Sequence, residues 1–489
     1  MKLCNFKPKP SSLALFFGLF SLLIFGFYPN PFPLTSDECF SLYHAQFPIS
    51  IIWRELSKGN NPPLFETLLH FWIQWFGNSE ISARSLSLIL VSIGSGCLWY
   101  LGYSLYKSRY IATGIGLFFI GSNTVFLFAQ ETRAYGLFLL LTIVVQGLWM
   151  IPNKTVFQKI LWSLCATALL YTHFFGIWVL AIQACFDGFN YFRNRKTNGT
   201  LISYWPWLLV LGLYSPYLRV LAIRFMDSAT SGTWMESAPW SAPYFTLWKF
   251  TNLPLAVIPT LILLGTSLYF LAKKSQPETY KFVYVFLSFA FPFIAMWLIS
   301  LPSPINIPMF NERYACFVIP SLALILPYPL YRSKHNPIVS KACLFLVSLL
   351  LVVEYFGRKH TVNQNIDVVP IVKSMKSNGT AVILEPDHAA FQWLYYTNPK
   401  KFNEWRADSI YHHMAQQLIQ DQVYILKTKR SLDSFGLTSK DSLYYVHLDN
   451  RKTAHTQAIE SQIKSYFRYI SPILQNQKHS KTTEFWKLK

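Results

Sequence analysis

Two adjacent carboxylates, Asp37 and Glu38, lie a few residues after the first long apolar run of the chain. A carboxylate of suitable pKa can take the proton from an attacking hydroxyl group, so each is a candidate catalytic base. Ser36 and Asp37 could equally cap a helix over 40–47, because short polar side chains are favoured at helix starts. The residues around the pair leave both interpretations open.

Two more polar motifs follow. Asn61 lies in Asn60-Asn61-Pro62-Pro63-Leu64, where the prolines either open a helix or hold the acidic loop in place. Glu131 and Arg133, followed by Tyr135, place an acid and a base in one short loop. That pairing suits an anionic substrate, or a metal together with a phosphate. Charges at the end of an apolar run are also tolerated as simple anchors, because their long side chains reach the interface.

The last two motifs also border apolar runs. His173 stands in Tyr171-Thr172-His173-Phe174-Phe175-Gly176, and Arg313 stands in Asn311-Glu312-Arg313-Tyr314. A lone histidine between apolar helices is more often structural than functional. Arg313 is either an interfacial anchor or a contact for a phosphate group.

The composition is that of a membrane protein. The chain has 489 residues, of which 52% are hydrophobic and 13% are charged, whereas a soluble domain has about a quarter charged residues. The net charge of +20 does not indicate a nucleic-acid partner, because much of the excess lies in short loops between apolar runs. The seven cysteines contain no C-x-x-C pair, which supports neither a zinc site nor a disulfide framework.

The apolar runs predict a polytopic α-helical protein with about eleven transmembrane helices. The segment 62–77 carries Glu66 and His70 one turn apart, which predicts an amphipathic helix at the outer surface or the lower part of an early span. The candidate spans are 11–28, 84–105, 111–129, 134–150, 160–173, 174–190, 204–222, 253–272, 281–301, 314–330 and 338–356.

Loop charges predict the orientation. Lys2, Lys7 and Lys9 precede the first span, and Lys and Arg residues recur in five alternate loops. Because positive loops stay in the cytoplasm, we expect a cytoplasmic N-terminus in the cell (inner) membrane. All five polar motifs then lie at the outer face.

The composition changes after Phe356. We expect a membrane domain over 1–356 and an extracytoplasmic domain over 357–489. Short apolar stretches at 380–384 and 422–426 predict buried strands, and 409–420 predicts an amphipathic segment between them. A small C-terminal α/β domain is the interpretation that fits this alternation.

The order of these motifs resembles the bacterial membrane glycosyltransferases of the dolichyl-phosphate-mannose-protein mannosyltransferase type, and it looks closest to the RgtA/B/C/D-like branch. The resemblance covers about residues 10–330. It rests on an acidic pair after the first span, then a Pro-Pro-Leu helix that ends in Phe-Gly and is followed by Ala83-Arg84. Glu-x-Arg-x-Tyr, Tyr-Thr-His-Phe-Phe-Gly and Glu-Arg-Tyr complete the series.

The resemblance implies a GT-C fold with a periplasmic active site, and transfer of a sugar from a polyprenyl-phosphate carrier with inversion. It implies that Asp37 is the catalytic acidic residue and Glu38 its acidic neighbour. Glu131 falls where related enzymes place a second acidic residue. The sequence departs from the family at Asn61-Pro62-Pro63, where His-Pro-Pro is frequent.

The residues agree with that chemistry. A phosphate leaving group needs no strong acid, and Arg133 or Arg313 could stabilise its developing charge. Asn61, Glu131, Tyr135 and His173 complete the expected substrate-binding set. Oxygen ligands from Asp37 and Glu131 would suit Mg²⁺ or Mn²⁺, but part of this fold class works without metal, so the metal requirement stays open.

We therefore expect a membrane glycosyltransferase that acts on a glycan, lipid or protein acceptor of the cell envelope. A lipid-linked-sugar flippase or transporter is the first alternative. It predicts ionisable groups at mid-membrane, whereas Asp187 and Glu354 lie near span ends. A non-catalytic envelope assembly protein is the second alternative.

Overall fold

The computed structural model forms two compact units. The first comprises Met1–Asn30, Trp53–Leu68 and Ile81–Asn363, and the second comprises Pro31–Ile52, Leu69–Glu80 and Gln364–Lys489. The residues that the structure describes are 9–27, 33–59, 61–194, 204–230, 235, 237–273, 279–302, 307–332, 338, 341–349, 353, 381–385, 389–403, 418–420, 422–425, 443–447, 470–474 and 484–488.

Helices that are long and apolar enough to cross a membrane dominate the first unit. Within the described residues there are 6 of them, or 7 if one bent pair counts as a span. The chain is therefore a multi-pass membrane protein, as predicted. The 6 are Pro10–Phe27 (α1), Glu80–Tyr106 (α5), Trp205–Asp227 (within α11, Trp205–Thr230), Pro254–Lys273 (η2, Pro254–Ala256, and α13, Val257–Lys273), Thr279–Ile299 (α14) and Tyr314–Arg332 (η3, Tyr314–Val318; α15, Ile319–Ile325; α16, Tyr328–Arg332).

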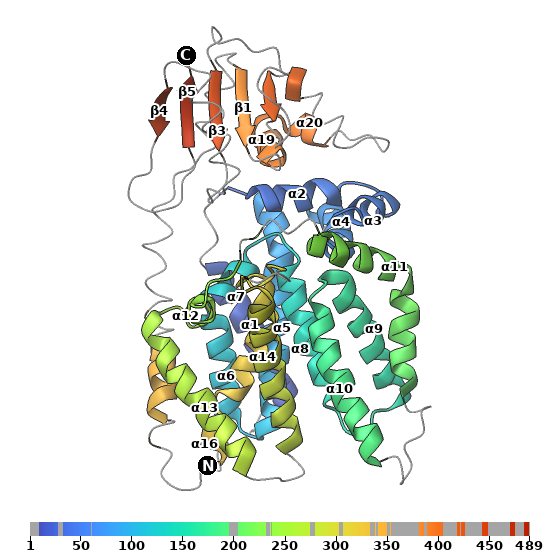
Figure 1. The fold of residues 1–489 in the computed structure, drawn as a ribbon, viewed down its shortest axis with the longest axis vertical. Helices are drawn as coiled ribbons and strands as arrows, with labels where there is room; N and C mark the ends of the chain where they lie inside the picture. Colours follow the sequence, from blue (N-terminus) through green and yellow to red (C-terminus); the bar gives the residue numbers. More distant parts are fainter. Residues whose placement is uncertain are drawn as a thin grey trace, which may run out of the picture. The chain divides into compact units, whose positions relative to one another are not determined.

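Three further apolar helices run beside one another (Figure 1): α8 (Tyr135–Trp149), α9 (Val156–Thr172) and α10 (Gly176–Asn194). Thr155 starts α9 with a capping box, in which its hydroxyl accepts the backbone N–H of Gln158. The predicted spans 134–150, 160–173 and 174–190 correspond to these helices. Of the last predicted span, 338–356, the structure describes 341–349 as helix. The full count of eleven stays a prediction.

Glycines allow the first helix to approach its neighbours closely. A Cβ atom on Gly96 of α5 would lie 2.7 Å from the carbonyl oxygen of Ala14. A Cβ atom on Gly116 would lie 2.5 Å from the ring of Phe17. Small residues commonly permit such contacts between membrane helices. These two glycines therefore set how closely α1 packs against α5 and against α6 (Arg109–Gly121), which contains Gly116.

The predicted span 111–129 is a bent pair of helices that together are apolar enough to cross a membrane. It consists of α6 (Arg109–Gly121) and α7 (Asn123–Ala129), which meet at an angle of 68°. Ser122 between them is extended, with φ −63° and ψ 128°. Asn252 holds the bend: its Nδ2 donates to the carbonyl of Gly121 at 2.9 Å, and its Oδ1 accepts the N–H of Asn123 at 2.7 Å. Hydropathy could not predict the bend, because the groups that stabilise it are distant in the sequence.

Asn252 itself follows α12 (Ala242–Thr251) in an unusual conformation, with φ +71°. Asparagine tolerates this region better than most residues. The conformation lets one side chain satisfy two backbone groups that a helix break leaves without partners.

A 5-stranded sheet lies in the second unit, with the order β2-β1-β3-β5-β4. β1 pairs in parallel with β2 and β3, while β5 pairs antiparallel with β3 and β4 (Figure 1). β1 and β2 fall within the segments 380–384 and 422–426, to within one residue, that were predicted as strands. The strands are β1 Ala381–Glu385, β2 Val423–Ile425, β3 Leu443–His447, β4 Ile470–Leu474 and β5 Glu484–Leu488.

Helices of distant sequence form the apolar core of the second unit. α2 (Ser36–Ala45) packs against α19 (Ala389–Thr397), which is followed by α20 (Pro399–Asn403). The ring centroids of Tyr43 and Phe391 are 5.3 Å apart, as are those of Tyr43 and Phe402. Most of the predicted amphipathic segment 409–420 lies outside the described residues. The domain division at residue 356 and the α/β class of the whole C-terminal segment stay predictions.

Candidate functional site

Asp37 lies in the first turn of α2, where its backbone is fixed by a capping box. The hydroxyl of Thr35 accepts the N–H of Glu38 at 3.3 Å, and Oε2 of Glu38 accepts the N–H of Thr35 at 2.9 Å. Glu38 is 1% exposed, whereas Asp37 is half-buried. The structure thus uses Glu38 to close the helix start and leaves Asp37 partly accessible beside it.

The loop between α7 and α8 carries Glu131 and Arg133. Oε1 of Glu131 lies 3.3 Å from Nη1 of Arg313, which comes from the segment before η3. The side chain of Glu131 is 12% exposed and that of Arg313 is 33% exposed. A neighbouring ion pair joins Glu312 to Lys249 of α12. Acidic and basic groups from three elements therefore meet around this loop.

Arg133 extends the group toward a second loop. Its Nη2 donates to Oδ1 of Asn61 at 3.4 Å. Asn61 lies just before Pro62 and Pro63, which precede α4 (Leu64–Phe76). The double proline restricts the backbone there, so the amide of Asn61 is presented from a stiff turn.

His173 lies in the turn between α9 and α10. Its Nδ1 accepts the N–H of Phe175 at 3.2 Å, and its ring stacks on Phe138 with centroids 4.6 Å apart. Burial among aromatic rings lowers the pKa of His173 to about 3, and the charge of Arg133 adds to that shift. The imidazole is therefore neutral at pH 7. Because Nδ1 accepts a hydrogen bond, its proton is on Nε2.

Gly176 makes this turn possible. A Cβ atom at Gly176 would lie 2.9 Å from the side chain of Leu169 and 3.1 Å from its carbonyl oxygen. α10 begins at Gly176, so the chain reverses within three residues. The ring of Tyr135 lies 5.9 Å from that of His173, and Tyr135 is within electrostatic range of Glu131.

The structure thus brings together six of the eight predicted site residues in the first unit. Asp37 and Glu38 belong to the second unit. The metal site expected between Asp37 and Glu131 therefore stays a prediction. Among the described residues, no three His, Cys, Asp or Glu side chains are grouped as they would be around a metal ion. The six are Asn61, Glu131, Arg133, Tyr135, His173 and Arg313.

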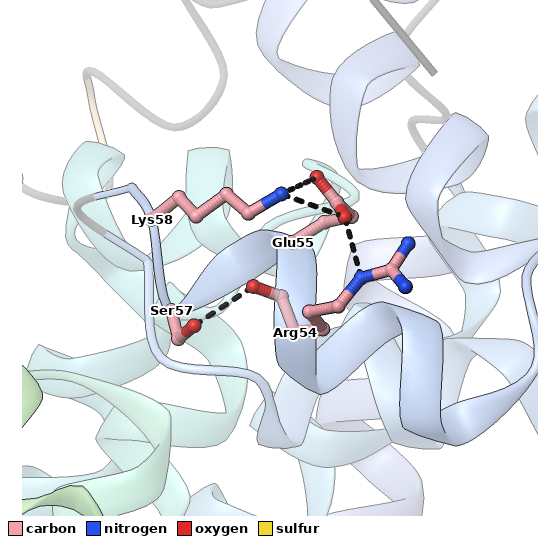
Figure 2. Close-up of polar contacts among 4 residues, drawn as sticks. All are labelled: Arg54, Glu55, Ser57 and Lys58. Carbon is pink, nitrogen blue, oxygen red and sulfur yellow. Dashed lines mark hydrogen bonds and ion pairs between the residues drawn. The ribbon is translucent and has the colours of Figure 1, made fainter. Parts of the chain in front are cut away.

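One charged cluster was missed by the sequence analysis (Figure 2). Nε of Arg54 lies 2.9 Å from Oε1 of Glu55, and Nζ of Lys58 lies 2.8 Å from Oε2. Burial acts to raise the pKa of Glu55, but hydrogen bonds from Lys58 and Arg54 outweigh it and hold that pKa below its ordinary value. In the sequence, this cluster is indicated by Glu55 between the basic residues Arg54 and Lys58, at the end of the otherwise apolar helix α3 (Ile49–Leu56).

The side chains of Arg54 and Lys58 are more exposed than that of Glu55, with which both are paired. The side chain of Glu55 is 6% exposed, against 50% for Arg54 and 63% for Lys58. A buried carboxylate thus orders two basic groups that remain accessible to an anion. Ser57 adds a hydrogen bond to the carbonyl of Arg54 at 2.8 Å, which ends the helix.

No family model matches the sequence. No curated protein matches it either. The architecture nevertheless has solved counterparts.

The solved counterparts include two crystal structures of ArnT from Cupriavidus metallidurans. The apo state has a TM-score of 0.54 and 12% sequence identity, covering 98% of this chain and 96% of that chain. The structure bound to undecaprenyl phosphate has a TM-score of 0.55 and 11% identity, covering 98% of each chain. At such identities the likeness shows the fold.

Proposed function

We propose that this protein is a membrane glycosyltransferase that transfers a sugar from a polyprenyl-phosphate-linked donor to an acceptor of the cell envelope. One observation carries the proposal: the fold is shared over nearly the whole chain with ArnT, one of whose structures is bound to undecaprenyl phosphate. A full-length match supports a common framework for binding a lipid phosphate.

The charges of the first unit support an anionic substrate. Arg133 and Arg313 come from different elements and border one loop, and Arg54 and Lys58 expose two further cations. Guanidinium groups suit phosphate oxygens, because their donors are rigidly spaced. Preorganised donors of this kind stabilise the charge that develops on a departing phosphate.

We assign the role of general base to Asp37. Its carboxylate takes the proton of the acceptor hydroxyl while that oxygen attacks the anomeric carbon and the phosphate leaves, with inversion. Glu38 sustains this function by closing the capping box. In the other unit, Glu131 orients Arg313 through their ion pair, and Asn61 does the same for Arg133.

Tyr135 and neutral His173 supply the remaining polar contacts to the substrate. Their rings adjoin one another beside the charged loop. We propose that the site faces the outer side of the membrane, with a cytoplasmic N-terminus, about eleven spans and an extracytoplasmic α/β domain over 357–489. The alternation of Lys and Arg between successive loops supports this orientation.

Mass spectrometry after deletion of the gene tests the proposal. The envelope glycans, lipids and proteins should lack one sugar residue, and the corresponding polyprenyl-phosphate sugar should accumulate. Unchanged glycans together with an unchanged donor pool would refute a transferase. A flippase would instead move the intact donor across vesicle membranes without forming a glycosidic bond.

A further inference from the structure

One helix of the C-terminal segment holds the turn that precedes α2. The hydroxyl of Tyr396 accepts the N–H of Leu34 at 2.6 Å, and Nε2 of Gln392 donates to the carbonyl of Leu34 at 2.8 Å. Oε1 of Gln392 accepts the hydroxyl of Ser36 at 3.1 Å. Gln392 and Tyr396 are four residues apart in α19, so they lie on the same face of that helix. All these residues belong to the second unit.

The hydrogen bonds of Gln392 are buried, and the one between Leu34 and Tyr396 is partly buried. Leu34 is fully buried, Ser36 is 6% exposed and Gln392 is 9% exposed. A buried backbone group that loses its partner is costly, so the polar groups on both sides of Thr35 are strongly held. Thr35 is the N-cap of α2, and Asp37 follows it by two residues.

Tyr396, one of the two α19 residues that bond to Leu34, has a further hydrogen-bond partner. The hydroxyl of Tyr396 donates to Oε1 of Glu80 at 2.7 Å, so both its donor and its acceptor capacity are used. The neighbouring hydroxyl of Tyr395 donates instead to the carbonyl of Asn78 at 3.0 Å. α19 therefore makes two kinds of polar contact within one unit: Gln392 and Tyr396 bond to Leu34 and Ser36, whereas the hydroxyl of Tyr395 bonds to Asn78.

We infer that Gln392 and Tyr396 are positioning residues that orient Asp37 for proton abstraction. The inference rests on the proposed function, since it assigns the base its support. Neither side chain contacts the reacting atoms in this scheme. They set the backbone from which the carboxylate projects, and a small displacement of a reacting group lowers the rate steeply.

Kinetics of the full-length protein test the inference, with Tyr396→Phe and Gln392→Leu as the variants and Tyr395→Phe as the matched control. Tyr396→Phe and Tyr395→Phe each remove one hydroxyl from adjacent positions of the same helix. We expect kcat to fall about tenfold in the first two variants with the KM for the donor unchanged, because only the placement of the base is disturbed. Tyr395→Phe should keep the wild-type kcat.

A second measurement separates this inference from the proposed function. Hydrogen exchange of the backbone N–H groups of Leu34, Thr35 and Glu38 should accelerate in Tyr396→Phe and Gln392→Leu but not in Tyr395→Phe. Unchanged exchange, or an equal loss of kcat in all three variants, would overturn the inference. A wild-type protein that transfers no sugar would overturn the proposed function, while the exchange rates still decide whether α19 holds this turn.

Discussion

Asp37 and Glu38 are adjacent in the sequence but differ in exposure and bonding. Glu38 is buried and accepts the N–H of Thr35, whereas Asp37 stays half-buried at the start of α2. A carboxylate in the first helical turn is stabilised by the helix dipole. Glu38 therefore closes the helix start, and the proposed role of catalytic base falls to Asp37.

Replacement of the base gives the most direct prediction at the scale of single residues. Asp37→Asn should lower the transfer rate by about 10²- to 10⁴-fold, the usual contribution of a general base, while the protein still inserts and folds. Glu38→Gln retains an oxygen that can accept the N–H of Thr35, so it should keep far more activity. Transfer assays on both purified variants provide the comparison. Near-normal transfer by Asp37→Asn would remove Asp37 from this role.

The neutral state of His173 predicts a pH dependence of stability. Its folded pKa is lowered to about 3 by burial and by Arg133, whereas an unfolded histidine titrates near 6.5. The unfolded chain thus binds more protons below pH 6.5, so stability is complete above that pH and declines as the pH falls toward 3. Thermal midpoints at pH 7.5 and 5.0 should differ more in the wild type than in His173→Gln.

Arg133→Gln is the control for this pH effect. It removes the second cause of the shift, so its loss of stability at low pH should lie between those of the wild type and His173→Gln. Equal losses in the wild type and His173→Gln would contradict a neutral, buried imidazole.

Sequence reasoning found most of the proposed site residues, because their motifs stand out against apolar surroundings. Glu131, Arg133 and Arg313 were expected on one face from loop charges, and the structure pairs Glu131 with Arg313. Gln392 and Tyr396 could not be found in this way. They are ordinary residues of a largely apolar helix, and they lie 356 and 362 residues from the groups they bind before α2.

At the scale of elements, the side chain of Asn252 bonds both sides of the break between α6 and α7. Asn252→Ala removes two hydrogen bonds and leaves the backbone groups of Gly121 and Asn123 without those partners. Each such bond contributes about 1 kcal/mol, so the free energy of unfolding should fall by about 2 kcal/mol. Thermal unfolding in detergent measures the effect.

Two further variants serve as controls for the stability loss of Asn252→Ala. Asn252→Asp keeps an oxygen to accept the N–H of Asn123 but loses the donor to Gly121, so it should be intermediate. Thr266→Ala removes a hydroxyl that bonds only to its own helix, at the carbonyls of Ile262 and Leu263, and should change stability less. An unfolding midpoint of Asn252→Ala equal to that of the wild type would show that the bend is held by other contacts.

The bend also marks the limit of prediction from hydropathy. The run 111–129 is apolar on average, although Ser122-Asn123-Thr124 interrupt it, so its hydropathy favours one membrane span. The angle arises because Asn252, from a loop more than a hundred residues later, satisfies the groups that the break exposes. The predicted span 160–173 ends within one residue of α9 but misses its start, which lies at the capping box of Thr155 and Gln158.

At the scale of the whole molecule, binding of the carrier should stabilise the fold. Undecaprenyl phosphate at a hundred times its Kd should add about 2.7 kcal/mol to the free energy of unfolding, because it binds the folded state alone. Undecaprenol has the same hydrocarbon without the phosphate, so its effect should be smaller. Equal shifts of the thermal midpoint for both lipids would contradict a phosphate site formed by Arg133 and Arg313.

The general class of fold followed from composition, because long apolar runs require helices in a membrane. The set of segments that form the second unit did not follow from composition. It joins residues 31–52 and 69–80 to the C-terminal segment, whereas the sequence suggested a simple division near residue 356. Contacts between segments so far apart leave no periodic signal in either of them.

The hydrogen bonds of Gln392 and Tyr396 with Leu34 also have a consequence for biosynthesis. Leu34 leaves the ribosome 362 residues before Tyr396, which at about 5–20 residues per second corresponds to roughly 20 to 70 s. During that interval the start of α2 lacks the partners that order it. A nascent chain that has not yet reached α19, or one that terminates before it, therefore lacks the hydrogen bonds that hold the residues before Asp37.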